Sequence, residues 1–157
     1  MNEFIQDISK YLIPALFVSI ITAIVTVKLS VKQFYSQRWW EKKAEAYSHI
    51  IENLSYLQYY FSEWFDEGIG IKRMRDKDKE KLSECYEKAR ESITKAAAIG
   101  AYIVSDATVV ALTKLLRELE KEDLSGNWVD DINRYHASAK ECIEKIREYA
   151  KVDLQKR

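Results

Sequence analysis

The run Tyr11-Leu-Ile-Pro-Ala-Leu-Phe-Val-Ser-Ile-Ile-Thr-Ala-Ile-Val-Thr-Val27 contains no charged residue and is flanked by Lys10 and Lys28. As an α-helix, its 17 residues would extend about 25 Å, near the lower limit for crossing a bilayer. The alternative is a buried core helix of a soluble protein, but such apolar runs usually span about 10–14 residues. No other segment is apolar enough to surround this one, so the run predicts one membrane-spanning helix.

Basic residues are distributed unequally around this run. Lys10 alone precedes it, whereas five basic residues follow closely: Lys28, Lys32, Arg38, Lys42 and Lys43. Because basic flanks of a membrane helix stay in the cytoplasm, the N-terminus is expected outside and the rest of the chain inside. We therefore predict a single-pass anchor in the inner (cytoplasmic) membrane over residues 1–32 and a cytosolic helical domain over residues 33–157.

A cluster of aromatic and basic residues follows the apolar run. Tryptophan favours the headgroup region of a bilayer, and lysine and arginine attract anionic lipids. The same residues could instead begin the packing of the cytosolic domain, and the sequence leaves both interpretations open. The predicted membrane-interface residues are Arg38, Trp39, Trp40, Lys42 and Lys43.

The composition predicts an all-α fold, in which the transmembrane helix is followed by a four-helix cytosolic bundle. The chain of 157 residues has only four glycines and one proline, and it shows no strand-like alternation. The four bundle helices are expected over residues 33–65, 76–104, 107–121 and 128–152, and the residues from 153 onward are expected to fray. The formal net charge is zero, which gives no indication of a nucleic-acid footprint.

Apolar periodicity and capping residues place these helices. The first has a heptad seam made of Tyr47, Ile50, Leu54, Leu57, Phe61 and Trp64. Ser105 or Asp106 is expected to cap the third helix, and Ser125 or Asn127 the fourth, whose apolar face begins at Trp128. A loop containing Gly68 and Gly70 separates the first two helices.

Small residues recur at four-residue spacing inside the membrane segment. Ala15, Ser19 and Ala23 would lie on one stripe of the helix, which allows close helix approach in lipid. Ordinary small-residue content of a single-pass anchor explains the pattern equally well, because no Gly-x-x-x-Gly motif is present. A homo-oligomer is the predicted assembly.

Catalytic and metal-binding motifs are missing from the sequence. It contains no phosphate-binding glycine loop, dinucleotide fingerprint, paired-histidine helix or nucleophile elbow. His49, His136, Cys85 and Cys142 are not spaced like metal ligands. We therefore predict a protein that is not an enzyme, with no catalytic residue, no metal and no cofactor.

A basic loop gives the best binding signal. The stretch Ile71-Lys-Arg-Met-Arg75 is extended by Lys77, Lys79 and Lys81, and the preceding helix displays Tyr56, Tyr59 and Tyr60. Cations beside free backbone N–H groups suit phosphate, and exposed tyrosines can stack on bases. The alternative is a solvated helix entry with the tyrosines in the core. The predicted ligand residues are Lys72, Arg73 and Arg75 for phosphate, with Tyr59 or Tyr60 for stacking.

Two stretches carry a resemblance to known proteins: Gln33-Phe-Tyr-Ser-Gln-Arg-Trp-Trp-Glu-Lys-Lys-Ala-Glu-Ala-Tyr-Ser-His-Ile-Ile-Glu-Asn-Leu54 and Lys95-Ala-Ala-Ala-Ile-Gly-Ala-Tyr-Ile-Val-Ser-Asp106. With them the chain resembles small bacterial membrane proteins that have one N-terminal span and a helical cytosolic domain. In layout it is similar to ancillary membrane effectors of type III CRISPR defence. That resemblance implies an antiviral effector whose cytosolic domain binds a cyclic oligoadenylate, oligomerises and acts on membrane lipid; it implies no particular ligand residue.

Two other functions remain open at this point. One is a membrane-tethered scaffold that docks a protein partner, and the other is a structural subunit of a larger membrane complex. The scaffold predicts an exposed apolar groove, whereas the effector predicts an electropositive pocket.

Overall fold

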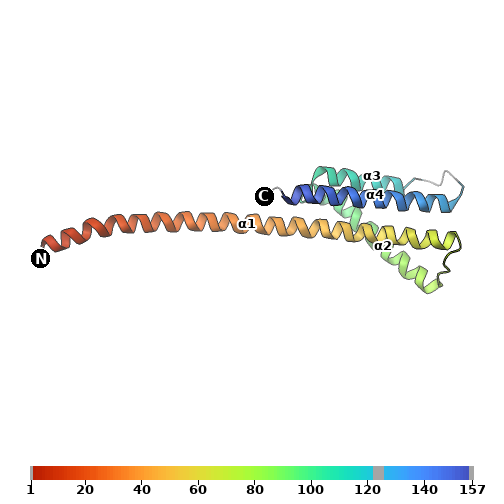
Figure 1. Cartoon of the computed structure of the whole chain (residues 1–157), viewed down its shortest axis with the longest axis horizontal. Helices are drawn as coiled ribbons and strands as arrows, with labels where there is room; N and C mark the ends of the chain where they lie inside the picture. The colour runs from red at the N-terminus through yellow and green to blue at the C-terminus, as the bar shows by residue number, and fades with distance from the viewer. Residues whose placement is uncertain (1, 122–125, 156–157) are drawn as a thin grey trace. The chain divides into compact units, whose positions relative to one another are not determined.

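The computed structural model describes residues 2–121 and 126–155, which form four α-helices and one short 3-10 helix (Figure 1). No strand occurs among these residues. The helices are α1 (Asn2–Gly68), α2 (Asp76–Ile99), η1 (Gly100–Tyr102), α3 (Asp106–Leu119) and α4 (Trp128–Gln155). The prediction of an all-α fold is confirmed. The predicted membrane helix and the predicted 33–65 helix are one continuous helix, α1.

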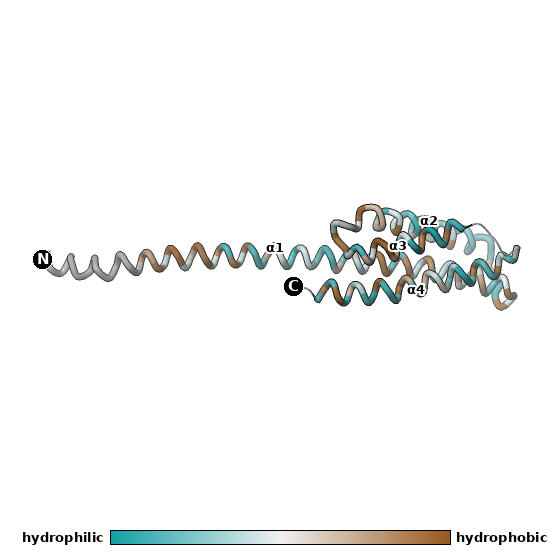
Figure 2. Tube along the Cα trace, turned by 90° about the horizontal axis from the view of Figure 1, so that it is seen from above, coloured by the Kyte–Doolittle hydropathy of each residue, from teal (hydrophilic) through white to brown (hydrophobic). Residues whose placement is uncertain are grey.

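By its internal contacts the chain divides into unit 1 (Met1–Trp40) and unit 2 (Glu41–Arg157). Unit 1 contains the apolar part of α1, coloured brown in Figure 2. From Leu16 to Tyr35 its large apolar side chains are all about half exposed or more, and no described residue covers them. An 18-residue window here is apolar enough to cross a membrane and has no buried residue. The structure therefore contains one candidate membrane-spanning helix near the N-terminus, as predicted, and a buried core helix does not describe it.

Unit 2 is a four-helix bundle in which successive helices run in opposite directions (Figure 1). Helix α2 packs on α3, and α3 packs on α4. The C-terminal part of α1 completes the bundle. There, Tyr60 stacks on Tyr86 of α2, with 4.2 Å between ring centroids, and Phe61 contacts Tyr135 of α4, with centroids 5.6 Å apart. The predicted bundle is confirmed.

The heptad seam of α1 forms one side of the core. Tyr47, Ile50, Leu54, Leu57 and Phe61 are all buried, and only the sixth seam residue is partly exposed. The other helices contribute Ala89, Ile93, Leu112, Leu115, Ala139, Cys142, Ile143, Ile146 and Ala150 to the same cluster. Apolar periodicity therefore predicts the core well, because burial of this stripe is what holds an amphipathic helix in a bundle.

Polar contacts of Tyr47 join three helices at one end of the bundle. The buried hydroxyl donates to Asp153 Oδ2 at 2.9 Å, lies 3.2 Å from Thr108 Oγ1 and accepts from Ser105 N at 3.2 Å. Lys43 forms an ion pair with the same Asp153, at 3.1 Å. The prediction that the chain frays from residue 153 is wrong at this point, because these contacts hold the last turns of α4, which continues to Gln155.

The connection between α2 and α3 also differs from the prediction. Helix α2 ends at Ile99 and not near residue 104, and η1 follows it. Gly100 is buried there, and a Cβ at this position would lie 3.2 Å from Val104 Cγ2, so close packing explains the glycine. Ser105 caps α3, as one of the two predicted candidates, and its hydroxyl accepts from Thr108 N.

The start of α4 shows one further difference. Asn127 Oδ1 accepts from Val129 N at 3.2 Å, which agrees with one predicted cap, while Ser125 lies outside the described residues. Trp128 was predicted on the apolar face but is half exposed. Its ring lies over the end of α1, where a Cβ added to Gly68 would be 2.7 Å from Trp128 Cη2. The indole therefore covers a helix end and does not enter the core.

Candidate anion-binding site

A pocket of about 560 Å³ lies between the exposed face of α1, the α1–α2 loop and the start of α2. Its lining residues are Tyr56, Tyr59, Glu63, Lys72, Arg73, Met74, Arg75, Asp78, Lys81, Leu82 and Cys85. Four of the five predicted ligand residues are among them, and they come from segments more than ten positions apart. The volume falls within the range of about 300–1,000 Å³ that is usual for small-molecule sites.

The loop is folded by its own backbone and one buried side chain. Gly70 has φ +79°, a conformation that other residues rarely adopt, and the chain reverses there. Two backbone N–H groups, of Ile71 and Lys72, donate to Asp66 O at 2.9 and 3.2 Å. Met74 is only 7% exposed, so its side chain is buried although it lies outside the main core cluster. The cationic residues on both sides of Met74 are consequently held at the surface.

Two of the pocket cations have carboxylate partners. Lys72 donates to Glu63, and this hydrogen bond raises the pKa of the Lys72 ammonium above its usual value. Arg75 Nε donates to Asp78 Oδ2 at 2.8 Å, which raises the pKa of Arg75 and lowers the pKa of Asp78. Both cations are therefore held in place, but any anion that binds them has to compete with a carboxylate.

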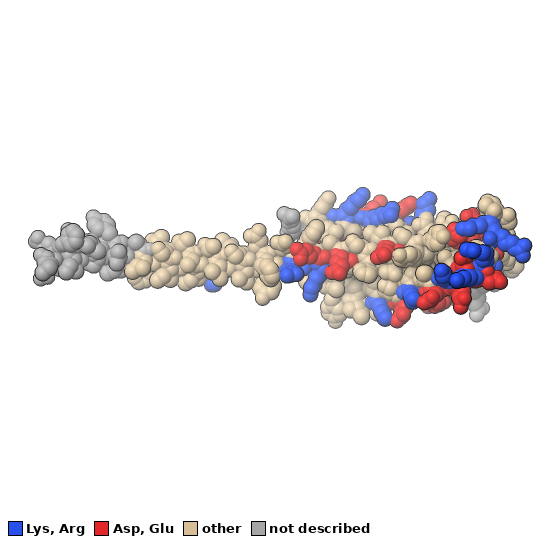
Figure 3. Space-filling model, turned by 90° about the horizontal axis from the view of Figure 1, so that it is seen from below, with Lys and Arg blue, Asp and Glu red and all other residues tan. Residues whose placement is uncertain are grey.

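The other two cations give the pocket its excess charge. Within the part of the chain that the structure describes, neither Arg73 nor Lys81 has an ion-pair partner, and both are exposed. Four cations against the carboxylates of Glu63 and Asp78 leave two positive charges in excess around the pocket. On the face drawn in Figure 3, basic and acidic side chains gather together at the end of unit 2 that holds the α1–α2 loop. The pocket thus has a local positive charge within a mixed surface.

The tyrosines separate into two groups. Tyr56 and Tyr59 line the pocket and are 47% and 54% exposed. Tyr60 does not line it; its ring stacks on Tyr86 within the bundle, and burial raises its pKa. Of the two predicted stacking residues, only Tyr59 is therefore available beside the cations, and Tyr60 follows the alternative interpretation as a packing residue. The ligand assignment of the pocket residues stays a prediction.

Several pocket residues were not among the predicted ligand residues. Tyr56 was available from the sequence, because it lies three positions before Tyr59 and shares its helix face. The sequence places Lys81 in the basic stretch, but nothing in it marks Lys81 as a ligand residue. The carboxylates of Glu63 and Asp78 carry no signal in the sequence, because charged residues are frequent along all these helices.

The predicted membrane-interface residues fall on both sides of the division between the units. In unit 1, the Arg38 guanidinium lies 5.3 Å from the centre of the Phe34 ring, and Trp39 and Trp40 are 50% and 41% exposed. In unit 2, Lys42 is exposed, whereas Lys43 is paired with Asp153. The ammonium of Lys43 therefore already has a carboxylate partner inside the bundle, and a role at lipid remains a prediction for all five residues.

The two cysteines lie in different surroundings, and metal-binding side chains do not cluster among the described residues. Among the residues described, no three His, Cys, Asp or Glu side chains are arranged to hold a metal ion. Cys85 is exposed in the pocket, whereas Cys142 is buried between α3 and α4, where burial raises the pKa of its thiol to about 12. The absence of catalysis stays a prediction.

Comparisons with known protein families, with curated proteins and with solved structures find no match to this chain. The pocket and the apolar helix are therefore the features from which a function can be argued.

Proposed function

We propose that this protein is a membrane-anchored receptor whose helical domain, unit 2, binds a phosphorylated ligand in the pocket between α1 and α2. The observation that carries this proposal is that Tyr59 lines one pocket with Lys72, Arg73 and Arg75. One arginine side chain can donate two parallel hydrogen bonds to phosphate oxygens, and an exposed tyrosine ring can stack on a base. The two surplus positive charges suit a ligand that carries phosphate, and the aromatic wall suits a nucleotide.

The membrane part of the proposal rests on unit 1. Its apolar side chains from Leu16 onward are exposed along α1, and such a surface is stable in lipid rather than in water. The basic residues that follow the apolar run support a single span with the N-terminus outside and unit 2 in the cytoplasm, in the inner membrane. Resistance to carbonate extraction, with protease access to unit 2 only from the cytoplasmic side, is the expected behaviour.

The ligand can be named more narrowly as a cyclic oligoadenylate, and the biological process as antiviral defence. The layout shared with ancillary membrane effectors of type III CRISPR defence favours a cyclic oligoadenylate, recognised by a homo-oligomer that acts at the membrane in antiviral defence. The pocket has the size of a site for one drug-sized ligand. If such a ligand binds, each pocket would hold one of its nucleotides, so this form of the proposal requires several copies of the chain around one ligand.

Thermal melting of the full chain in detergent tests this proposal. Addition of AMP, pyrophosphate or a cyclic oligoadenylate should raise the melting temperature, because a ligand at about 100 times its dissociation constant stabilises the folded state by about 2.7 kcal/mol. Arg73→Glu should abolish the rise. Arg147→Glu, at an exposed position of α4 outside the pocket, is the matched control and should keep it.

The outcomes separate the general from the narrow proposal. A shift with the cyclic oligoadenylate alone supports the defence effector, and a shift with AMP or pyrophosphate supports a receptor for another phosphorylated ligand. If no compound shifts the native protein, or if Arg73→Glu responds like the native protein, the pocket is not the binding site and the proposal fails.

A further inference from the structure

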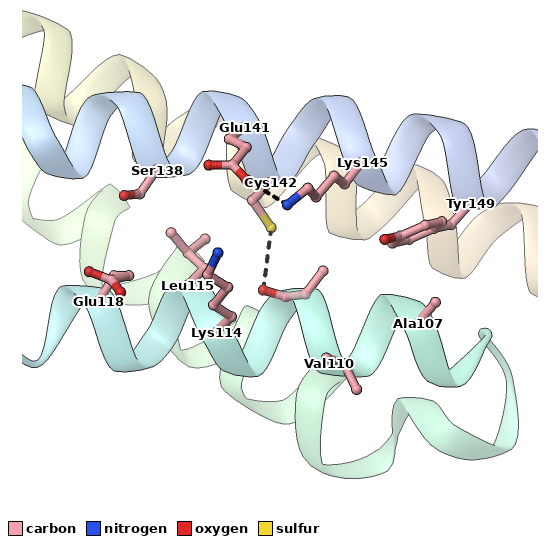
Figure 4. A pocket seen from close by; sticks show the side chains of 11 residues that line it. Ala107, Val110, Lys114, Leu115, Glu118, Ser138, Glu141, Cys142, Lys145 and Tyr149 are labelled. Carbon is pink, nitrogen blue, oxygen red and sulfur yellow. Dashed lines mark hydrogen bonds and ion pairs between the residues drawn. The ribbon is translucent and has the colours of Figure 1, made fainter.

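A groove of about 450 Å³ runs between α3 and α4 (Figure 4), and none of its lining residues belongs to the α1–α2 pocket. Its floor is apolar and well packed, with Leu115 and Cys142 only 2% and 5% exposed. The Cys142 thiol donates to Ala111 O at 3.8 Å, so the floor has no free polar group at this point. Val110, beside the groove, is 68% exposed. A hollow with an apolar floor and an exposed apolar rim is typical of a surface that another molecule covers.

Residues of the two rims lie opposite one another along the groove. Figure 4 shows Lys114 on α3 across from Glu141 on α4, and Ala107 across from Tyr149. The electrostatics agree with this placement: hydrogen bonding to Lys145 lowers the pKa of Glu141, and the charge of Lys114 lowers it further. Lys114 has no ion-pair partner within the described part of the chain. The α3 rim therefore carries Lys114, Glu118 and small apolar residues, and the α4 rim carries the Tyr149 ring and Glu141, which already pairs with Lys145 at 2.5 Å.

This arrangement is self-complementary under one particular symmetry. When two copies face each other across a two-fold axis parallel to the groove, the α3 rim of each copy lies opposite the α4 rim of the other. The rotation does not change the position of a residue along the groove. It would set Lys114 of one copy against Glu141 of the other, twice, and it would lay each Tyr149 ring over Ala107 and Val110 of the opposite copy. An antiparallel pair would not bring these levels together.

We infer that the α3–α4 groove is a self-association surface and that its occupant is a second copy of this chain. In this pair each helix runs parallel to the same helix of the other copy. The observation that points to a second copy is that Lys114, which has no ion-pair partner among the described residues, would face Glu141 of the other copy beside an apolar strip. A parallel pair also places Glu41 of both copies at the same end, as two chains anchored in one membrane require; this last point alone rests on the proposed membrane anchoring.

Charge reversal tests the surface in the full chain in detergent. Copies labelled at the exposed Cys85 with a donor or an acceptor dye report association by energy transfer. Lys114→Glu and Glu141→Lys alone should each weaken self-association about tenfold, because two exposed pairs change from attraction to repulsion. A mixture of donor-labelled Lys114→Glu with acceptor-labelled Glu141→Lys should regain native association. Lys151→Glu, exposed on α4 outside the groove, is the matched control.

Cross-linking in native membranes tests the geometry without altering the charges. In a Cys85→Ser background, Ala107→Cys chains mixed with Tyr149→Cys chains should form a dimer with a short bis-maleimide. Ala107→Cys mixed with Lys151→Cys should not. The inference is overturned if the first pair gives no more dimer than the second, or if the mixed charge variants associate no better than either one alone. Neither result depends on whether the α1–α2 pocket binds a ligand.

Discussion

Tyr47→Phe removes one oxygen atom from the place where α1, α3 and α4 meet. The Tyr47 side chain is 1% exposed, so phenylalanine would keep the ring packing and lose only the hydroxyl. That hydroxyl has one hydrogen and two acceptor sites, and its three closest partners are Asp153 Oδ2 at 2.9 Å, Ser105 N at 3.2 Å and Thr108 Oγ1 at 3.2 Å. The geometry therefore uses the whole hydrogen-bonding capacity of the group.

The expected loss follows from what each partner keeps. Asp153 retains the ion pair with Lys43, and Thr108 Oγ1 retains Ser105 Oγ at 3.0 Å, whereas Ser105 N loses its acceptor. A hydrogen bond to a charged group contributes about 1.5–3 kcal/mol and a neutral one about 0.5–1.5 kcal/mol. Because two partners are compensated in part, the free energy of unfolding should fall by about 2–3 kcal/mol.

Urea unfolding of the full chain in detergent, followed by circular dichroism, measures this loss. Tyr102→Phe is the matched control, since Tyr102 is 81% exposed and the same oxygen is removed there; its stability should stay within about 0.5 kcal/mol of native. If Tyr47→Phe also unfolds within that margin, the hydroxyl does not hold the end of the bundle, and our explanation for the ordered end of α4 is wrong.

Three further predictions concern the thiols, the membrane segment and the loop. At pH 8 a thiol reagent should modify Cys85 and leave Cys142 unmodified until the protein unfolds. The folded pKa of Cys142 is about 12, above its ordinary value of 9.0, so the thiol stabilises the folded state below pH 9 and this contribution is lost as the pH rises toward 12. The difference in unfolding free energy between the native protein and Cys142→Ala should therefore shrink from pH 9 upward. A constant difference would contradict the raised pKa. Ile20→Lys should lower the fraction of chain recovered in carbonate-washed membranes, because a lysine at mid-span costs about 2.5–3.5 kcal/mol. Ser48→Lys in unit 2 is the control and should leave this fraction unchanged. Equal recovery of the two variants would contradict a membrane span. Gly70→Ala should destabilise the native protein by about 1 kcal/mol from backbone strain alone, since nothing lies within 4 Å of the new methyl group, and an unchanged urea midpoint would refute that explanation.

The bundle could be predicted because the apolar spacing and the capping residues that define its helices are local features of the sequence. The spacing of Tyr47, Ile50, Leu54, Leu57 and Phe61 predicts a buried stripe, and the structure buries all five. Capping residues likewise predicted Ser105 or Asp106 as the cap of α3, and Ser105 is the cap in the structure. These signals work from sequence alone because each of them depends on neighbours only a few positions away.

The sequence also carries a signal that distinguishes Tyr59 from Tyr60. At about 100° per residue, Tyr59 lies roughly opposite Phe61 on the helix, whereas Tyr60 lies beside the buried stripe. The seam therefore already indicated that Tyr59 faces outward, which is where the structure places it. The angular positions of the two tyrosines on the helix therefore separate the two candidates.

Contacts between distant residues were beyond the sequence. A polar C-terminal segment looks frayed by composition, yet Asp153 accepts from Tyr47, which is 106 positions away. The partners of the pocket cations are similar cases: only the folded loop brings Lys72 to Glu63 of α1. Both contacts pair common residue types across the fold, so no local pattern distinguishes them from solvated surface charges.

Equilibrium dialysis of the detergent-solubilised full chain against labelled AMP, pyrophosphate and a cyclic oligoadenylate tests the central claim most directly. At low salt, we expect the native protein to bind at least one of these ligands, with about one phosphorylated group held per chain. Arg73→Glu should lose that binding, and Arg147→Glu should retain it. Absence of binding by the native protein, or equal binding by Arg73→Glu, would contradict an anion receptor built on the α1–α2 pocket.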